Sequence, residues 1–156
     1  MMTHNERIEI LGKTGEKIVS NWLSRNGHLV EMSLDNYDRT KDMIVDGDRL
    51  VEVKTEQPYV YKDCVSFRKT QLTKCSKVDD LYVVTSPALI NPRYKHNGKI
   101  FRIDPKSFHS FSYRTKFGIE MVGIPFDQPA VEEVYVLSEQ ERNELMKYSH
   151  SEYKSR

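Results

Sequence analysis

Apolar residues recur every three or four positions over residues 8–22, which is the period of an amphipathic helix. Thr3 and Glu6 before this run have capping-box spacing, and Gly27 after it is a stop signal. The pattern predicts one long helix near the N-terminus, with residues 12–15 as the place where its glycines could break it.

Four runs of strand character follow this helix, interrupted by one short helical segment. The predicted strands span residues 28–32, 42–45, 50–55 and 81–85. Ser66 is expected to cap a helix that ends near Ser76, and Asp46-Gly47-Asp48 is a hairpin signal between the second and third strands. Up to residue 87 the expected order is therefore helix, three strands, helix, strand.

The pattern loosens after residue 87. Strands are predicted at 99–103 and 119–124, with a helical turn over 105–111 between them, and a second capping box opens a polar helix over about 138–148. Together these patterns predict an α/β protein. A β-rich, basic C-terminal extension is expected to pack on the same domain.

Composition limits the class of protein. With 156 residues, 38% of them apolar and 30% charged, the chain is expected to form one compact domain without help from disulfides or a structural metal. No apolar run approaches the ~20 residues of a membrane span, and residues 1–7 are too polar for a secretory leader. We therefore expect a cytoplasmic protein, or one of the host-cell cytoplasm if the chain is viral, with no membrane partner.

The net charge of +1 hides a separation of charge along the chain. Residues 93–118 carry seven basic residues and one acid, whereas residues 119–152 carry eight acids and two basic residues. Aromatic residues are interleaved with the basic ones in the first of these segments. Such a stretch suits contact with phosphates and stacking on bases, although its aromatic residues could equally belong to the core.

The predicted hairpin offers residues suited to phosphodiester hydrolysis, which needs an activated water and stabilisation of charge on the phosphate. Mg²⁺ supplies both when carboxylates hold it, and a nearby lysine can orient the water. Because side chains alternate along a strand, Glu52 and Lys54 share one face. A three-residue Asp46-Gly47-Asp48 loop would pair Asp42 with Glu52 and add it to this face. A two-residue turn would instead pair Asp42 with Val51.

These residues, in this order, resemble the active-site motif of the PD-(D/E)XK nuclease superfamily, which includes restriction enzymes, Holliday-junction resolvases, homing endonucleases and phage nucleases. In that family a helical glutamate precedes an aspartate at the start of one strand, and an acid-x-lysine follows on the next. Glu16 matches the first element, Asp42 the second and Glu52-Val53-Lys54 the third. The resemblance covers about residues 12–85. Lys41 stands where the family motif has its proline.

The resemblance implies a restriction-endonuclease-like core over residues 1–87, with a central mixed sheet flanked by helices. Residues 88–156 would be a DNA-contacting extension. It implies a metal-dependent endonuclease acting on double-stranded DNA, either site-specific like homing enzymes or structure-specific like junction resolvases. Gln71 falls where many members carry a polar residue on the helix after the motif, which makes it a further candidate catalytic residue. A small nuclease of this kind is expected to act as a homodimer or higher homo-oligomer, so that two sites can cut two strands.

The same resemblance implies a role for each motif residue. Asp42 and Glu52 would bind Mg²⁺, for which Mn²⁺ could substitute, and the Val53 carbonyl would assist. Glu16 would bind or position a metal, and Lys54 would position the nucleophilic water. In-line attack would leave a 5′-phosphate.

Basic residues beside the motif and in the extension are candidate contacts to the DNA backbone. They are Lys41, Arg68, Lys69, Lys74, Arg93, Lys95, Lys99, Arg102, Arg114 and Lys116. Three alternatives stay open at this point. The hairpin could be ordinary, with Glu52 and Lys54 as an exposed pair; the protein could be a catalytically silent DNA-binding module on a nuclease scaffold; or the substrate could be RNA.

Overall fold

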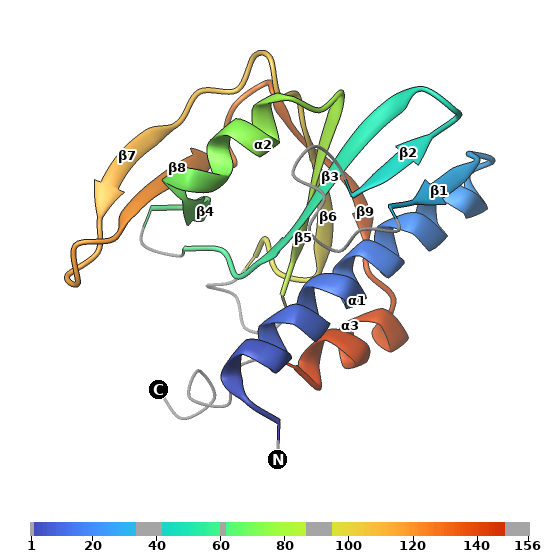
Figure 1. Ribbon diagram of the computed structural model, residues 1–156, viewed down its shortest axis with the longest axis horizontal. Coiled ribbons are helices and arrows are strands. Elements are labelled where there is room, and N and C mark those ends of the chain that lie inside the picture. The colour runs from blue at the N-terminus through green and yellow to red at the C-terminus, as the bar shows by residue number, and fades with distance from the viewer. Residues whose placement is uncertain (1, 34–41, 60–61, 87–94, 149–156) are drawn as a thin grey trace.

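The computed structural model describes residues 2–33, 42–59, 62–86 and 95–148, and it builds them into two sheets and three α-helices (Figure 1). The larger sheet contains, in spatial order, β1 (Val30–Met32), β2 (Met43–Val45), β3 (Arg49–Glu56), β5 (Asp80–Thr85), β6 (Lys99–Ile103) and β9 (Val131–Val136). β3 and β5 run parallel and all other neighbours run antiparallel. The predicted α/β class with a central mixed sheet is therefore confirmed.

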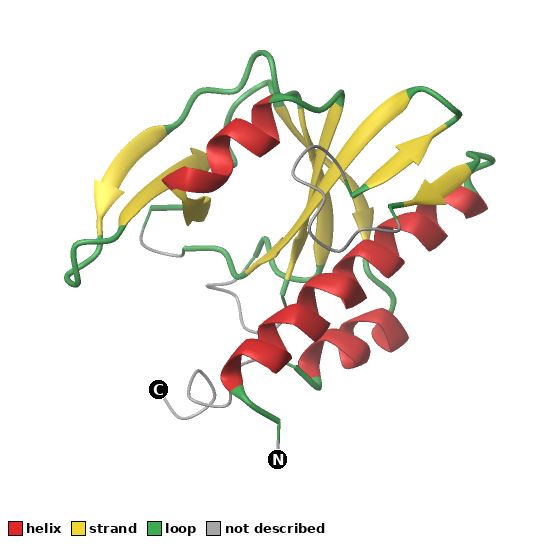
Figure 2. Ribbon diagram, in the orientation of Figure 1, coloured by secondary structure: helices red, strands yellow, loops and turns green. Residues whose placement is uncertain are grey.

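A smaller antiparallel sheet has the order β4 (Cys64–Arg68), β8 (Glu120–Pro125) and β7 (Phe111–Arg114). β4 continues directly into a 3₁₀ turn, η1 (Lys69–Gln71), and then into the short helix α2 (Leu72–Ser76). Figure 2 shows α2 beside the small sheet and away from the two other helices. The crossover from β3 to its parallel neighbour β5 therefore passes through β4, η1 and α2.

The other two helices, α1 (His4–Arg25) and α3 (Glu139–Met146), lie side by side on the opposite face of the large sheet (Figure 1). Two apolar clusters result. One includes Val19 and Leu145 from these helices and Val53 from β3, whereas the other includes Phe67 and Leu81 and fills the space between the two sheets. None of the helices within the described ranges has the length and apolarity that crossing a membrane requires.

The chain after residue 87 is part of this architecture. β6 pairs with β5, β9 pairs with β6, and α3 packs against α1. The predicted extension therefore supplies two strands of the large sheet and one of the two helices on its outer face.

The predicted long first helix is confirmed without the possible break at its glycines, whereas the predicted helix cap at Ser66 is wrong. α1 continues through Gly12 and Gly15 without a break, because its apolar face packs on the sheet along its length. Ser66 does not cap a helix; it lies in β4 opposite Gly123, because the buried Val65 and Phe67 on either side of it follow the period of a strand.

The region between residues 105 and 136 also differs from the prediction. Only residues 105–107 form a turn, and Phe111 already begins β7. β9 was not predicted because its sequence, VEEVYV, contains two adjacent glutamates, and both are exposed on this edge strand.

Gly15 is buried where α1 crosses β3, and a Cβ atom at this position would overlap the Thr55 hydroxyl. Glycine in a helix interior costs about 1 kcal/mol relative to alanine, so the close approach of helix and strand explains its presence. The contact also determines the position of the next residue, Glu16, beside the edge of β3.

We predict that Gly15→Ala destabilises the protein by about 1–3 kcal/mol, because the added methyl group overpacks the contact with Thr55. Urea denaturation followed by circular dichroism measures the effect. Gly12→Ala is the matched control: it lies in the same helix with no atom within 4 Å of the added Cβ, and it should stabilise by about 0.5–1 kcal/mol. Thr55→Ala should partly restore the Gly15→Ala variant, and equal stabilisation by both glycine substitutions would contradict this account.

Candidate active site

The register of the β2–β3 hairpin brings Asp42 opposite Glu52. Met43 pairs with Val51, which leaves Asp46-Gly47-Asp48 as a three-residue loop. Asp46 and Gly47 both take left-handed backbone conformations, with φ of 54° and 85°. The odd-length loop that the site requires is therefore confirmed, and the two-residue alternative is excluded.

β2 runs from Met43 to Val45, and Asp42 lies just before it, where the pairing with β3 stops. The Asp42 backbone N–H donates to the Val51 carbonyl at 2.8 Å, and the Asp42 Oδ2 accepts from the Val53 N–H at 2.8 Å. The Asp42 carboxylate thus accepts a hydrogen bond that a backbone carbonyl would accept if the strand pairing continued. This pair of hydrogen bonds holds the Asp42 carboxylate against the open edge of β3.

The Val53 carbonyl lies along the same edge. On β3 the carbonyls of Leu50 and Glu56 accept hydrogen bonds from the β5 side, from the N–H groups of Asp79 and Ser86. Because backbone groups alternate along a strand, the Val53 carbonyl points the other way, toward the Asp42 side. The predicted carbonyl ligand therefore lies on the edge that carries the Asp42 carboxylate.

Glu52 is the most buried acid of the site, with 1% of its surface exposed. Its Oε1 lies 3.3 Å from the Lys54 Nζ, and its Oε2 lies 3.0 Å from the Lys74 Nζ while accepting no well-directed hydrogen bond. The Lys54 Nζ also donates to the Gln71 Oε1 at 2.7 Å. Glu52 and Lys54 are therefore not the exposed surface pair of the ordinary-hairpin alternative.

Lys74 contacts both carboxylates. Besides Glu52, its Nζ lies 3.4 Å from the Asp42 Oδ1, so one ammonium group from α2 bridges the two acids of the hairpin. The sequence identified Lys74 only as a candidate DNA contact. A signal for its position was its spacing from Gln71, because residues three apart share one face of a helical segment.

Glu16 completes a group of three acids. Burial raises the pKa of Glu16 to about 7, and the charge of the Asp42 carboxylate and a hydrogen bond with it add to the rise, while Lys74 and Lys13 oppose it. The effect of Asp42 on the Glu16 pKa indicates that the two carboxyl groups lie close together. The helical glutamate of the motif and its strand aspartate are therefore neighbours in space.

Excess negative charge also acts on β3. Burial and the Asp42 charge raise the pKa of Glu52 to about 7, against the opposing charges of Lys54 and Lys74. Glu56, which strand alternation places on the same face and which was not predicted as a site residue, also has its pKa raised to about 7 by burial. Desolvated carboxylates next to one another favour the binding of protons or of a cation.

The donors present fit a magnesium ion. Within the described ranges no group of three or more His, Cys, Asp or Glu side chains has the arrangement of a preformed metal cluster. Mg²⁺ does not require one, because it binds through one or two carboxylates and keeps several waters. Asp42 and Glu52 each direct one oxygen toward the same ammonium group, so both acids can direct an oxygen toward a shared cation.

No protein-family model matches the chain, and no curated protein is significantly similar to it in sequence. The functional conclusion therefore depends on the geometry of the site and on the motif that it contains.

The separation of charge along the sequence is partly offset in space. Antiparallel pairing joins the basic and acidic segments, so that Lys99 lies 2.6 Å from Glu133 and Arg114 lies 2.7 Å from Glu120. These lysine and arginine residues already have acidic partners. Two further candidate DNA contacts, Lys41 and Arg93, lie outside the described residues.

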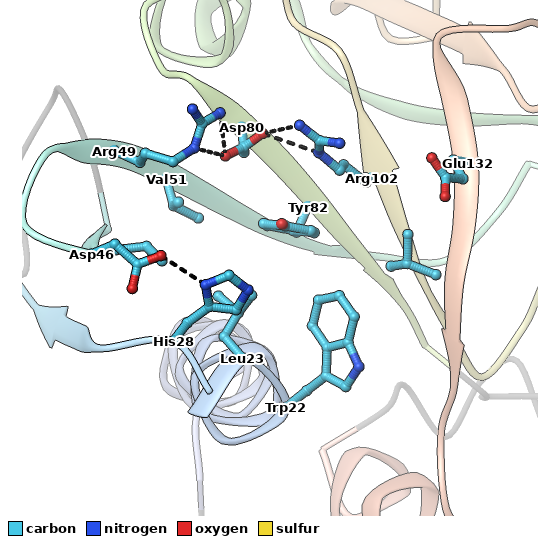
Figure 3. A pocket seen from close by; sticks show the side chains of 12 residues that line it. Trp22, Leu23, His28, Asp46, Arg49, Val51, Asp80, Tyr82, Arg102 and Glu132 are labelled. Carbon is cyan, nitrogen blue, oxygen red and sulfur yellow. Dashed lines mark hydrogen bonds and ion pairs between the residues drawn. The ribbon is translucent and has the colours of Figure 1, made fainter. Parts of the chain in front are cut away.

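Arg102 belongs to a different cluster on the α1 face of the sheet (Figure 3). Its guanidinium and that of Arg49 hold the buried Asp80 carboxylate, at 2.7 and 2.8 Å, and all three residues line a cavity of about 350 Å³. Asp80 lies next to Leu81 on β5, and Leu81 pairs with Glu52, so strand alternation puts the cluster on the face opposite Glu52. Arg102 therefore joins β6 to β5 and is not a neighbour of the candidate active site.

The remaining basic candidates are exposed. Arg68 and Lys69 end β4 and begin η1, Lys95 lies 3.9 Å from Asp63, and Lys116 lies over the ring of Phe117. Phe117 is 80% exposed, whereas other aromatic residues of the basic segment, such as Phe101, are in the core. The core interpretation of the aromatic residues therefore holds for part of the segment only.

The raised pKa of Glu52 predicts a specific pH dependence of stability. Because the folded state binds this proton more tightly than the unfolded chain, stability is lost as pH rises from the ordinary glutamate pKa of 4.5 to the raised pKa of about 7. Glu52→Gln removes the ionisation, so without metal it should be more stable than the wild type at pH 8 by about 1–3 kcal/mol, with the difference disappearing near pH 4.5. Urea denaturation in EDTA across this pH range measures it. A constant difference between the two proteins at all pH values would show that Glu52 does not ionise unfavourably.

Proposed function

We propose that the protein is a metal-dependent endonuclease that hydrolyses phosphodiester bonds in double-stranded DNA. The observation that carries the proposal is the convergence of Asp42 and Glu52 at one point, with Lys54 on the same face of β3 and Glu16 reaching Asp42 from α1. These four residues match the positions of the PD-(D/E)XK motif that the sequence resembles, and they come from α1, from the residue before β2 and from β3.

The order of elements supports the same proposal. α1 is followed by the antiparallel strands β1, β2 and β3, then by α2, and then by β5 parallel to β3. This is the order expected of a restriction-endonuclease-like core, with β4 as an insertion before α2. We propose that the fold belongs to this type.

The residues of the site suit the reaction in separate ways. Bound Mg²⁺ supplies activation of water and stabilisation of charge on the phosphate. Asp42 and Glu52, with the Val53 carbonyl, would hold the ion. Lys54 is anchored between Glu52 and Gln71, so its ammonium is positioned to orient a water and to offset charge on the phosphate. Glu16, beside Asp42, would bind or position the metal.

The DNA would approach along the exposed start of η1. Lys69 is only two residues from Gln71, so their Cα atoms are at most about 7 Å apart. Arg68 precedes it, and both side chains lie at the surface. A homodimer that cuts two strands remains a prediction of the family resemblance.

The second candidate function is not enzymatic: a catalytically silent DNA-binding module. Buried acids next to a phosphate would repel it and would contribute nothing to simple binding. An RNA nuclease would use the same residues and would differ only in its substrate.

Cleavage of supercoiled plasmid in Mg²⁺ tests the proposal. We expect nicked or linear product from the wild type and at least a ~100-fold lower rate from Asp42→Ala, Glu52→Ala and Lys54→Ala. The first two variants lose a carboxylate that would hold the metal ion, and the third loses the ammonium that would offset charge on the reacting phosphate. A parallel digestion of RNA separates the two substrate classes.

The matched control for cleavage is Glu132→Ala, since Glu132 is an exposed acid on the edge strand β9 and belongs to the cavity on the opposite face. It should cleave at the wild-type rate. Absence of cleavage with every DNA form tried, or cleavage that survives both Glu52→Ala and Lys54→Ala, would reject the nuclease proposal.

The salt dependence of DNA binding tests the proposed approach. Arg68→Ala and Lys69→Ala should each weaken binding to a labelled duplex and lower the slope of log affinity against log salt by about one, because each phosphate contact releases counterions. Fluorescence anisotropy in EDTA measures binding without cleavage. Lys99→Ala is the control, because Lys99 is paired with Glu133. An unchanged slope in both test variants would place the DNA elsewhere.

A further inference from the structure

One ammonium group occupies the point on which the two hairpin acids converge. The Lys74 Nζ lies 3.0 Å from the Glu52 Oε2 and 3.4 Å from the Asp42 Oδ1. Among the described residues it is the only cation recorded in contact with both carboxylates. Lys54, by comparison, contacts Glu52 alone and is held by Gln71.

This arrangement has an electrostatic reason. Asp42, Glu52 and Glu16 lie together at a partly desolvated edge, where like charges repel strongly. In the metal-free protein, one positive charge between Asp42 and Glu52 reduces that repulsion. Breaking a buried ion pair by removing one partner is costly because it leaves the other charge without compensation.

The same point cannot hold the ammonium and a divalent cation together. Mg²⁺ binds carboxylate oxygens at about 2.0–2.1 Å and carries twice the charge, so an ammonium about 3 Å from the same oxygens would lie against it and be repelled. Lys74 has a route outward, because its side chain is 21% exposed and its four-carbon stem is flexible. Lys54 has no need to move, since its contacts lie on the other oxygen of Glu52.

We propose that Lys74 is an internal counter-ion that occupies the metal position of the Asp42–Glu52 site and is displaced when a divalent cation binds. The proposal rests on the proposed function in using the same two acids as metal ligands. It goes beyond it by assigning Lys74 a part in metal affinity, as a positioning residue of the metal-free state.

Metal binding without DNA tests the proposal directly. Mn²⁺ and Mg²⁺ are titrated into the wild type and into Lys74→Met, and binding is followed by calorimetry. The variant replaces the ammonium that would compete with the metal by a side chain of similar length and no charge. We expect Lys74→Met to bind either ion roughly 10- to 100-fold more tightly, the range over which groups surrounding metal ligands alter affinity.

Lys77→Met is the matched control, because Lys77 is an exposed lysine that follows α2. The substitution removes the same charge from the same segment. Its metal affinity should be close to that of the wild type. Equal or weaker metal binding by Lys74→Met than by the wild type overturns the proposal. An equal gain in Lys77→Met overturns it too, because the effect would then be one of overall charge.

A second measurement uses the wild type and does not depend on the folding of a variant. Acetylation of lysines, mapped by mass spectrometry, should show Lys74 protected in EDTA and several-fold more reactive in Mn²⁺, with Lys54 unchanged. Lys74 reactivity that does not rise at saturating metal overturns displacement.

The outcomes separate this proposal from the proposed function. Tighter metal binding by Lys74→Met together with failure to cleave any nucleic acid would support the counter-ion and reject the nuclease. Failure of both proteins to bind metal would overturn the metal site itself. Cleavage by the wild type with no gain in metal affinity in Lys74→Met would reject only the counter-ion.

Discussion

The candidate site depends on the hydrogen bond between the Asp42 carboxylate and the Val53 N–H. β2 stops pairing with β3 at this point, and a backbone donor on an open strand edge would otherwise need another partner. The carboxylate satisfies that donor and becomes fixed beside Glu52. One interaction therefore ends a strand and positions an acid for chemistry.

The rest of the site is arranged around this edge from both sides of the sheet. α1 approaches on one face, and the absence of a side chain at Gly15 lets it come close enough to place Glu16 at Asp42. η1 and α2 approach on the other face and bring Gln71 to Lys54 and Lys74 to both acids. An open strand edge is the one place where side chains from both faces can meet.

The balance of charge at this edge explains why acids and lysines are found together. Burial is the main cause of the raised pKa values of Glu16 and Glu52, the charge of Asp42 adds to the rise, and the nearby lysines oppose it. Such a site is unfavourable for stability alone. Its retention is understandable if the uncompensated charge serves to attract a metal ion.

The sequence by itself determined the local features of this protein. The long first helix, the capped terminal helix, a hairpin at Asp46-Gly47-Asp48 and the shared face of Glu52 and Lys54 follow from periodicity, caps and turn residues within short segments. The strand register of the structure then selected the three-residue loop over the two-residue one. Contacts between distant segments were decided only by the tertiary structure. Lys74 meets Asp42 across 32 positions, and Arg102 is drawn to Asp80 on the opposite face. The charge separation of the C-terminal half is partly offset when β6 pairs with β9, because Lys99 then contacts Glu133. Local pattern determines which way a side chain points along its own element, whereas its partner depends on which elements pack together, and that choice depends on burial summed over the whole chain.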